Sequence, residues 1–463
     1  MSIHKNEKGI VLIFAKKALL QTGWTTNVQI KVEHGLISTI TPQSTAAKND
    51  LVVDTLLPAL SNLHSHSFQR AMAGMTEFRA LGRDSFWTWR ELMYRFVNRI
   101  TPDQMQAIAA LVFMEMQEAG YAAVGEFHYV HHQSGGAPYA DIAELSNQIY
   151  AAANTTGIGL THLPVLYTYG GAGELPLSEG QLRFGNSVNQ FAQLVERARD
   201  GLKHLPADSR IGIAPHSLRA ISPTDLKAAL AQHSAGPIHV HIAEQPKEVQ
   251  DIQSWLGARP VEWLLNTANV NSNWCLIHAT HMTEDETIRL AKSGAVAGLC
   301  PITESNLGDG PFNGPTYLNA GGAFGIGSDS NVNITLTEEL RTLEYSQRLR
   351  DVARNVLVVG EGSVGETLYK GAARGGAQAL GRNSGEIAVG HLADLVAIDS
   401  SMPALFALKP EQLLDGLVFA AKDNVITDLW SAGRHSVQNG RHIAREHITK
   451  NYRTAVAKLL EDA

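Results

Sequence analysis

Hydrophobic and polar positions follow two different patterns along this chain. Near both ends, short runs alternate with a period of two, as in residues 28–32, and glycines separate them. That pattern is typical of half-buried strands joined by tight turns. Between the ends, apolar strand-like runs alternate with longer segments of helical periodicity, which indicates parallel strands joined by crossover helices.

The middle of the chain contains eight strand-like runs, each followed by a helix or a loop. They cover residues 56–60, 122–127, 159–166, 210–214, 237–242, 274–278, 295–300 and 323–327. Helices are expected over residues 103–119, 142–153 and 188–202. Two more are expected: one begins at Pro223 with Ser222 as its N-cap, and the other ends at Ser293 with Thr283 as its N-cap. The strand count, and the lack of a Gly-x-Gly-x-x-Gly turn after the first strand, favour a closed (β/α)8 TIM-type barrel over an open doubly wound sheet.

The two chain ends have too little apolar surface to fold separately. We expect them to pair into one small β-sandwich domain beside the barrel. The predicted division is residues 1–56 for the first part of the sandwich and residues 57–384 for the catalytic barrel. Residues 385–463 form the second part of the sandwich and a C-terminal helix.

Composition narrows the class of protein. The 463 residues have a net charge of -7, which disfavours nucleic acid as a partner. No run reaches the 18 or more apolar residues of a membrane span, and the first residues lack the apolar segment of a secretory signal. Cys275 and Cys300 lie in apolar runs without partners for a disulfide or a cysteine metal site. We expect a cytoplasmic protein; its oligomeric state stays open, with a homodimer as one option.

Polar residues gather at the carboxyl ends of four expected barrel strands, where such a barrel carries its chemistry. His64 and His66 are separated by one residue, so both side chains point to the same side of an extended segment. Imidazole and carboxylate groups suit a borderline divalent ion, and three or four of them leave a position for water. The predicted ligands are His64, His66, His241 and Asp329.

The fifth strand offers two candidate ligands, because His239 and His241 face the same side of it. We choose His241, since Glu244 follows three residues later and can reach water at the ion. A single barrel histidine is more often a satisfied core residue than a ligand. For the whole set the core interpretation fails, because burying so many polar groups without partners costs several kcal/mol each.

The segments Asn62-Leu-His64-Ser-His66, His241-Ile-Ala-Glu244, His278 and Ser328-Asp329-Ser-Asn331 resemble the cytosine/guanine-deaminase branch of the amidohydrolase superfamily. The resemblance covers essentially the whole chain, including the split β domain. It implies a single divalent ion, for which Zn²⁺ is the first choice and Fe²⁺ the alternative. Independently, no lysine occurs between Lys203 and Lys227 that could bridge a second ion from the fourth strand.

Finer features resemble the formimidoylglutamate deiminase family within that branch. They include the segments Phe86-Trp-Thr-Trp-Arg90 and Thr303-Glu-Ser-Asn306-Leu-Gly. The resemblance implies a small dicarboxylate amidine as substrate. We expect Arg90 and Arg219, on two loops at the catalytic mouth, to bind its carboxylates through their planar forks. Further predicted substrate contacts are Gln69, Tyr129 and His216.

The expected reaction is hydrolysis of N-formimino-L-glutamate to N-formyl-L-glutamate and ammonia, a step of histidine degradation. The ion activates water, which attacks the formimino carbon, and Glu244 shuttles the proton. Asp329 orients the water, and His278 acts as a fixed electrostatic partner of the developing oxygen.

Two alternatives remain open. One is a related mononuclear amidohydrolase for another amidine or an aromatic base, either a deaminase or an imidazolonepropionase-like enzyme. Against a base, the loops show no evident stacking and amide-pairing site. The other is a non-catalytic barrel, which the intact ligand set opposes.

Overall fold

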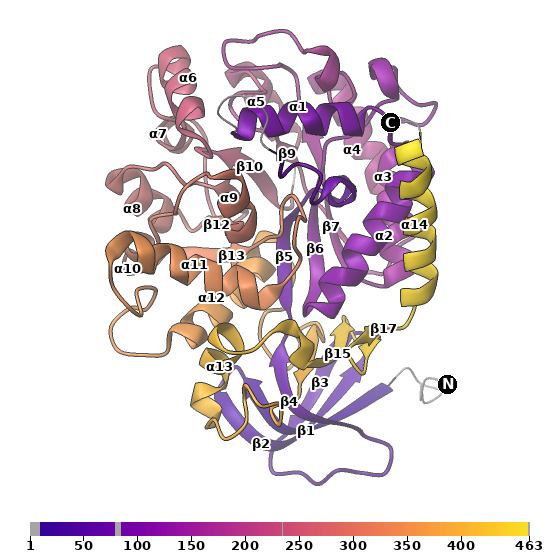
Figure 1. Cartoon of the computed structure of the whole chain (residues 1–463), viewed down its shortest axis with the longest axis vertical. Coiled ribbons are helices and arrows are strands. Elements are labelled where there is room, and N and C mark those ends of the chain that lie inside the picture. Colours follow the sequence, from indigo (N-terminus) through magenta and orange to yellow (C-terminus); the bar gives the residue numbers. More distant parts are fainter. Residues whose placement is uncertain (1–9, 79–84, 234, 462–463) are drawn as a thin grey trace.

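The computed structural model describes residues 10–78, 85–233 and 235–461, so the first nine residues, expected to carry no signal segment, lie outside the described chain. A β sheet built from both chain ends lies at one end of the molecule, and the strands and helices of the middle segment lie above it (Figure 1). None of the described helices is long and apolar enough to cross a membrane.

The end sheet joins strands from both chain ends in one hydrogen-bonded path of eight. Its order is β17-β16-β15-β14-β4-β1-β2-β3. The strands are β1 (Ile10–Leu20), β2 (Gly23–Glu33), β3 (Leu36–Thr41), β4 (Leu51–Pro58), β14 (Leu395–Ile398), β15 (Ile426–Ser431), β16 (Arg434–Gln438) and β17 (Arg441–His442). The antiparallel pair of β4 with β14 connects the two halves. The path folds back on itself, because buried Trp430 of β15 shares one core cluster with Val28 and Ile30 of β2, which agrees with the expected sandwich.

The middle segment forms two runs of parallel strands. They are β5 (Leu60–Ser65), β6 (Tyr121–His128), β7 (Gly159–Leu166), β8 (Arg210–Ile211), β9 (Ala214–Pro215), β10 (Ile238–Ile242), β11 (Trp274–His278), β12 (Val296–Leu299) and β13 (Ala323–Ile326). Parallel bridges join the runs on both sides, Ile213 to Ile238 and Ser65 to Asp329. Because β8 and β9 share one strand position, eight positions close into the expected barrel.

The first barrel strand begins later than expected. Residues 56–60 were predicted as one strand, but Leu56 pairs with both Ala18 of β1 and Ala397 of β14. Leu56 and Leu57 therefore belong to β4 of the end sheet, and the barrel starts with β5 at Leu60. An apolar run that continues through Pro58 cannot reveal this boundary, because both flanking strands are buried.

Helices cover the outside of the barrel. They are α1 (Phe86–Val97), α2 (Pro102–Glu118), α3 (Glu144–Thr156), α4 (Val188–Leu202), α5 (Pro223–Gln232), α6 (Pro246–Leu256), α7 (Pro260–Thr267), α8 (Glu284–Ser293), α9 (Pro301–Leu307), α10 (Gly314–Asn319), α11 (Leu336–Asp351), α12 (Val364–Ala379), α13 (Leu413–Phe419) and α14 (Arg445–Glu461). Short 3-10 turns include η1 (Ser67–Met72), directly after β5. The last helix, α14, runs along α2 on the barrel wall (Figure 1).

Candidate metal centre and active site

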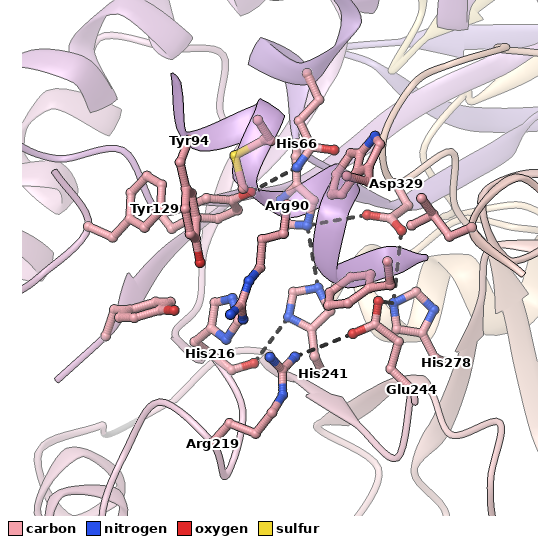
Figure 2. A pocket seen from close by; sticks show the side chains of 17 residues that line it. His66, Arg90, Tyr94, Tyr129, His216, Arg219, His241, Glu244, His278 and Asp329 are labelled. Carbon is pink, nitrogen blue, oxygen red and sulfur yellow. Dashed lines mark hydrogen bonds and ion pairs between the residues drawn. The ribbon is translucent and has the colours of Figure 1, made fainter. Parts of the chain in front are cut away.

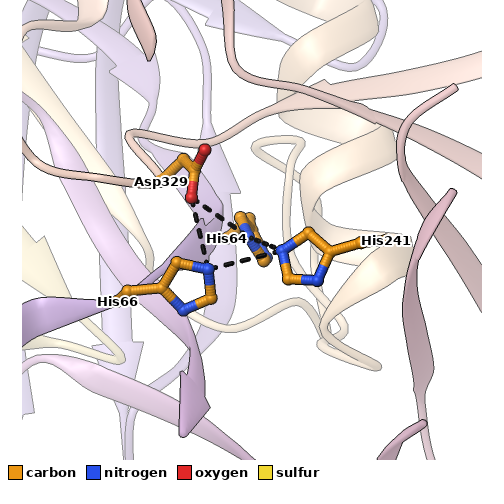
Figure 3. A group of neighbouring side chains, drawn as sticks. All are labelled: His64, His66, His241 and Asp329. Carbon is orange, nitrogen blue, oxygen red and sulfur yellow. Dashed lines mark hydrogen bonds and ion pairs between the residues drawn. The ribbon is translucent and has the colours of Figure 1, made fainter. Parts of the chain in front are cut away.

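Four side chains converge at the carboxyl end of the barrel (Figure 3). The Nε2 atom of His241 lies 3.1 Å from that of His64 and 3.3 Å from that of His66. Asp329 Oδ1 lies 3.4 Å from His64 Nε2 and 3.3 Å from His66 Nε2. Such separations fit ligands that each lie about 2.0–2.2 Å from one shared ion. The structure thus brings together the four predicted ligands and leaves out His239.

The hydrogen bonds behind these rings decide what the cluster can hold. His66 Nδ1 donates to Phe127 O at 2.9 Å, and His241 Nδ1 donates to His216 O at 3.1 Å. In the neutral rings, both Nε2 atoms are then left unprotonated, and two lone pairs face each other without a proton between them. Such an arrangement is unfavourable without a cation and is the usual support of metal-binding histidines. The residues therefore fit a divalent ion.

Electrostatics keep this ligand set in the form that binds metal. Burial lowers the pKa of His64 to about 3 and also lowers the pKa of His66 and His241, so the rings are neutral. Burial alone would raise the pKa of Asp329, but the facing histidines lower it below its usual range, and the carboxylate stays ionised.

The local backbone aims these residues at the centre. Asn62 Nδ2 donates to Ser328 Oγ at 2.7 Å, and Ser328 N donates to Asn62 Oδ1 at 3.1 Å, so the ends of β5 and β13 are held together. His278 and Asp329 have left-handed φ angles of 68° and 45°. Such angles are uncommon outside glycine and cost about 1–3 kcal/mol each, and they occur at functional sites.

Glu244 and His278 lie beside the cluster. His278 Nε2 is 3.8 Å from Glu244 Oε1 and 3.9 Å from Asp329 Oδ2. Its Nδ1 atom contacts Glu304 Oε1 at 3.2 Å. Burial opposes a charge on His278, but the carboxylates of Glu244, Glu304 and Asp329 raise its pKa to about 10. Burial raises the pKa of Glu244, against the opposing charges of His278 and Arg219.

A pocket opens onto this group (Figure 2). Its walls contain all five residues predicted to contact substrate, together with Glu244, His278 and Asp329. The predicted contacts in the wall are Gln69, Arg90, Tyr129, His216 and Arg219. The remaining lining side chains are mostly aromatic: Phe86, Trp89, Tyr94, Tyr167 and Phe184.

The two arginines reach the pocket from different supports. Arg90 was expected on a loop but lies on α1, with its guanidinium 4.7 Å from the Trp87 ring centre. Its Nε atom is buried without a hydrogen-bond partner among the described residues. Arg219 lies in the turn after β9 and is buried. It forms ion pairs with Glu244 at 3.4 Å and Glu248 at 3.7 Å.

The other predicted contacts lie deeper in the pocket. Gln69, in η1, donates through Nε2 to Tyr129 Oη at 2.8 Å. Its Oε1 atom is buried and has no partner within the described parts of the chain. His216 Nδ1 contacts Ser217 Oγ at 2.9 Å, and the His216 ring packs 4.9 Å from that of His241.

Sequence reasoning missed three contributors to this site. Glu304, in α9, fixes His278, and Glu248, in α6, accepts the backbone N–H of Glu244 at 3.1 Å. Both are charged residues just beyond a strand end, which was the only available signal. The aromatic lining was missed as well, and it supplies the stacking surface of the stacking and amide-pairing site that the loops were expected to lack. Tyr94 and Phe184 could not be placed from the sequence because their segments were not assigned to the mouth.

Comparison with known proteins agrees with this geometry. The model of the amidohydrolase family matches residues 55–435, and the model described as formimidoylglutamate deiminase HutF, N-terminal domain, matches residues 10–51. The chain belongs to the amidohydrolase family. A formimidoylglutamate deiminase of Pseudomonas aeruginosa is 47% identical over 452 residues, which cover 97% of this chain and 99% of the relative. A 5-methylthioadenosine/S-adenosylhomocysteine deaminase of Natronomonas pharaonis is 26% identical over 87% of this chain and 84% of its own.

Solved structures of other amidohydrolases share the fold. An amidohydrolase from Brucella melitensis superposes with a TM-score of 0.93 at 46% identity, over 97% of this chain and all of that chain. A zinc-bound adenosine deaminase from Xanthomonas campestris gives a TM-score of 0.79 at 21% identity, over 97% and 98% of the two chains. The second likeness extends the shared fold to relatives with few identical residues.

Proposed function

We propose that this amidohydrolase converts N-formimino-L-glutamate and water to N-formyl-L-glutamate and ammonia, a step of histidine degradation. The observation that carries the proposal is one pocket holding both Arg90 and Arg219 beside Glu244, His278 and Asp329. Two cations beside a metal-ligand cluster suit a substrate with two carboxylates and a hydrolysable carbon. The 47% identity with the Pseudomonas aeruginosa deiminase supports the same substrate.

In this proposal, His64, His66, His241 and Asp329 hold one divalent ion, either Zn²⁺, our first choice, or Fe²⁺. Three neutral imidazoles and one carboxylate are suitable donors for both. When bound, the ion supplies hydroxide near neutral pH by lowering the pKa of water. Every later step is assigned to side chains of the chain itself.

Substrate binding relies on charge. Arg90 and Arg219 each take one carboxylate, because a guanidinium offers two parallel N–H donors to a carboxylate. Arg219 contacts Glu248 through Nε and Glu244 through Nη2, so its Nη1 atom remains for the substrate carboxylate. Gln69, Tyr129 and His216 line the same wall and contribute further polar contacts. Anionic Glu244 attracts the cationic formimino group.

Proton transfer is assigned to Glu244. It takes one proton from the attacking water and delivers it to the departing nitrogen, which leaves as ammonia. The second proton of that water leaves the new oxygen for solvent as the carbonyl forms. His278 lies 3.8 Å from Glu244 and 3.9 Å from Asp329, between the two carboxylates. It stabilises the negative charge that develops on the substrate carbon's new oxygen.

The direct test measures ammonia release from N-formimino-L-glutamate and the metal content of the same sample. We expect turnover together with about one divalent ion per chain. Turnover with two tightly bound ions would contradict the mononuclear centre but keep the substrate. A fully metallated sample that releases no ammonia would contradict the substrate.

A second candidate function is deamination of an aromatic base. Phe86, Trp89 and Tyr94 line the pocket, so a planar ring has stacking surfaces there. Adenosine, guanine and cytosine belong in the same ammonia assay. A neutral base offers no negative charge to the two guanidinium groups at the mouth, so we expect these compounds to be inactive.

The proposed domain division follows the sequence: residues 1–56 and 385–463 for the end domain, and residues 57–384 for the barrel. The pairing of β4 with β14 supports it, although β4 continues to Pro58. We also propose a cytoplasmic location, where the free cysteines Cys275 and Cys300 stay reduced.

A further inference from the structure

Three neighbouring barrel strands bring a thiol next to the catalytic residues. Strands β11, β12 and β13 are adjacent in the sheet and end close to His278, Cys300 and Asp329. One ligand atom from each of these three residues lies within 4.8 Å of the other two. From the sequence, neither cysteine had partners for a metal site, but the barrel register supplies them for Cys300.

We propose that His278, Cys300 and Asp329 form a second, inhibitory site for a thiophilic divalent cation such as Zn²⁺ or Cd²⁺. Asp329 can serve both sites because its oxygens face different groups. Its Oδ1 atom lies 3.4 Å from His64 and 3.3 Å from His66. Its Oδ2 atom faces His278 Nε2 at 3.9 Å.

Glu304 holds the two other ligands in place. Its Oε1 atom accepts the backbone N–H of Cys300 at 2.9 Å and contacts His278 Nδ1 at 3.2 Å. One carboxylate oxygen therefore fixes the His278 ring with Nε2 toward Asp329 and anchors the residue that carries the thiol. Carboxylates that orient ligand histidines in this way are common behind metal sites.

The donor set determines which cations fit. Thiolate is a soft ligand that favours Zn²⁺ and Cd²⁺ over Mg²⁺ or Ca²⁺, and imidazole with carboxylate completes a borderline site. Binding forms a sulfur–metal bond and a bond from His278 Nε2 to the metal. The S–H proton of Cys300 and the Nε2 proton of the charged His278 ring are both released to solvent, with no change of oxidation state. Cys300 is fully buried, whereas His278 and Asp329 line the pocket, so the cation enters through the substrate pocket.

Inhibition follows from the shared residues, and this part rests on the proposed function. An ion at His278 and Asp329 Oδ2 occupies the groups assigned to the developing oxygen and to the orientation of water. The second site would therefore fill only when free cation exceeds the amount that the first site needs. Activity should then fall as the concentration of added Zn²⁺ rises.

The binding test uses the protein carrying its single ion, titrated with Cd²⁺ and followed by ultraviolet thiolate-to-cadmium absorbance. The four ligands of the first site include no sulfur, so metal exchange there gives no such signal. We expect the band in wild type and in Cys275→Ser, a matched control at an equally buried cysteine. Cys300→Ser and Cys300→Ala should both lack it. No band in wild type, or a band that persists in both Cys300 variants, would overturn the site.

The inhibition test adds excess Zn²⁺ during hydrolysis of N-formimino-L-glutamate. Removing one ligand should raise the inhibitory Zn²⁺ concentration by at least about tenfold in Cys300→Ser, while Cys275→Ser follows wild type. Equal sensitivity of all three proteins would contradict the inhibitory role. If this substrate gives no ammonia at all, the proposed function fails, and the cadmium band still decides the second site.

Discussion

Buried charges gather at both mouths of the barrel, but the two groups differ in how completely they are paired. At the base, Arg382 contacts Asp394 at 3.0 Å and Asp208 at 3.1 Å, and Arg434 contacts Asp208 at 2.7 Å. Every buried side-chain nitrogen and oxygen of these residues has a partner. At the catalytic mouth, buried polar atoms without hydrogen-bond partners among the described residues include His64 Nδ1, Gln69 Oε1, Arg90 Nε, Arg219 Nε and Glu248 Oε1.

The difference separates stability from function. The base cluster joins the start of the barrel strands to the end sheet, and its charges offset one another's desolvation. The catalytic mouth keeps buried polar atoms, among them Gln69 Oε1 and Arg90 Nε, that have no hydrogen-bond partner among the described residues. Since an unmade buried hydrogen bond costs about 1–3 kcal/mol, we propose that bound substrate completes these two pocket-lining atoms. Substitutions at the base should therefore affect stability, and substitutions at the mouth should affect catalysis.

The largest effect is expected at the metal centre. His64→Ala removes a ligand, so metal content and ammonia release should fall together to background. His239→Ala is the matched control from the strand that carries His241, because His239 Nε2 contacts Ala379 O at 2.7 Å and His239 is not one of the four clustered ligands. Elemental analysis and the ammonia assay measure both. Loss of the ion from the His239 variant would mean that the ligand on β10 was wrongly chosen.

The next largest effect concerns proton transfer. Glu244→Gln keeps the shape of the side chain and all four predicted ligands, so kcat should fall by about 10²–10⁴ at unchanged metal content. Urea unfolding of this variant should show little loss of stability, because Arg219 keeps its ion pair with Glu248 and His278 keeps its contact with Glu304. A kcat within threefold of wild type would assign the proton shuttle to another residue.

The third prediction tests the base cluster. Arg382→Met leaves Asp208 and Asp394 buried without their shared partner and should lower the free energy of unfolding by about 3–5 kcal/mol. The kcat of the folded, metal-loaded molecules should stay near wild type. Arg374→Met breaks an exposed pair with Glu386 nearby and should cost no more than about 1 kcal/mol. Equal destabilisation by the two variants would remove the distinction between the mouths.

The smallest effect is expected at Arg90. A charge-assisted hydrogen bond contributes about 1.5–3 kcal/mol, so Arg90→Met should lower kcat/KM for formiminoglutamate by roughly 10- to 150-fold. Its stability should change little, because this half-buried side chain has no ion pair among the residues that the structure describes. Formiminoglycine, which has one carboxylate, should be a poor substrate for wild type and should lose less from one of the two substitutions, Arg90→Met or Arg219→Met. Equal losses on both substrates in both variants would contradict carboxylate binding by these arginines.

Regular parts of the fold could be predicted because local pattern and tertiary environment agree there. The strands over residues 159–166 and 274–278 and the helix over residues 188–202 have the expected bounds. Helix α1 was missed because aromatic residues favour strands when only local preference is considered. In the fold, Phe86 and Met93 lie on the buried face of this helix. Helix α12 was missed because it is rich in glycine. Gly375 packs so closely on the Phe324 carbonyl that a Cβ would overlap it.

The candidate site could be predicted where chemistry is tied to a strand end. His64 and His66 share one face of a strand, and the positions of His241, His278 and Asp329 follow from barrel topology. Side chains that reach the pocket from helices could not be placed in this way. Trp89 and Tyr94 depend on how α1 crosses the mouth, and the Cys300 contact depends on the register between β12 and its neighbours.

The left-handed backbone at His278 and Asp329 limits which replacements give interpretable data. Asparagine tolerates this conformation better than most residues, whereas a β-branched side chain resists it. A valine or isoleucine at either position would combine two defects, loss of the functional group and a displaced chain. Asp329→Asn and His278→Asn keep the backbone as it is and isolate the chemistry. A library screened at these positions without that restriction would rank residues by their fit to φ, and only secondarily by their reactivity.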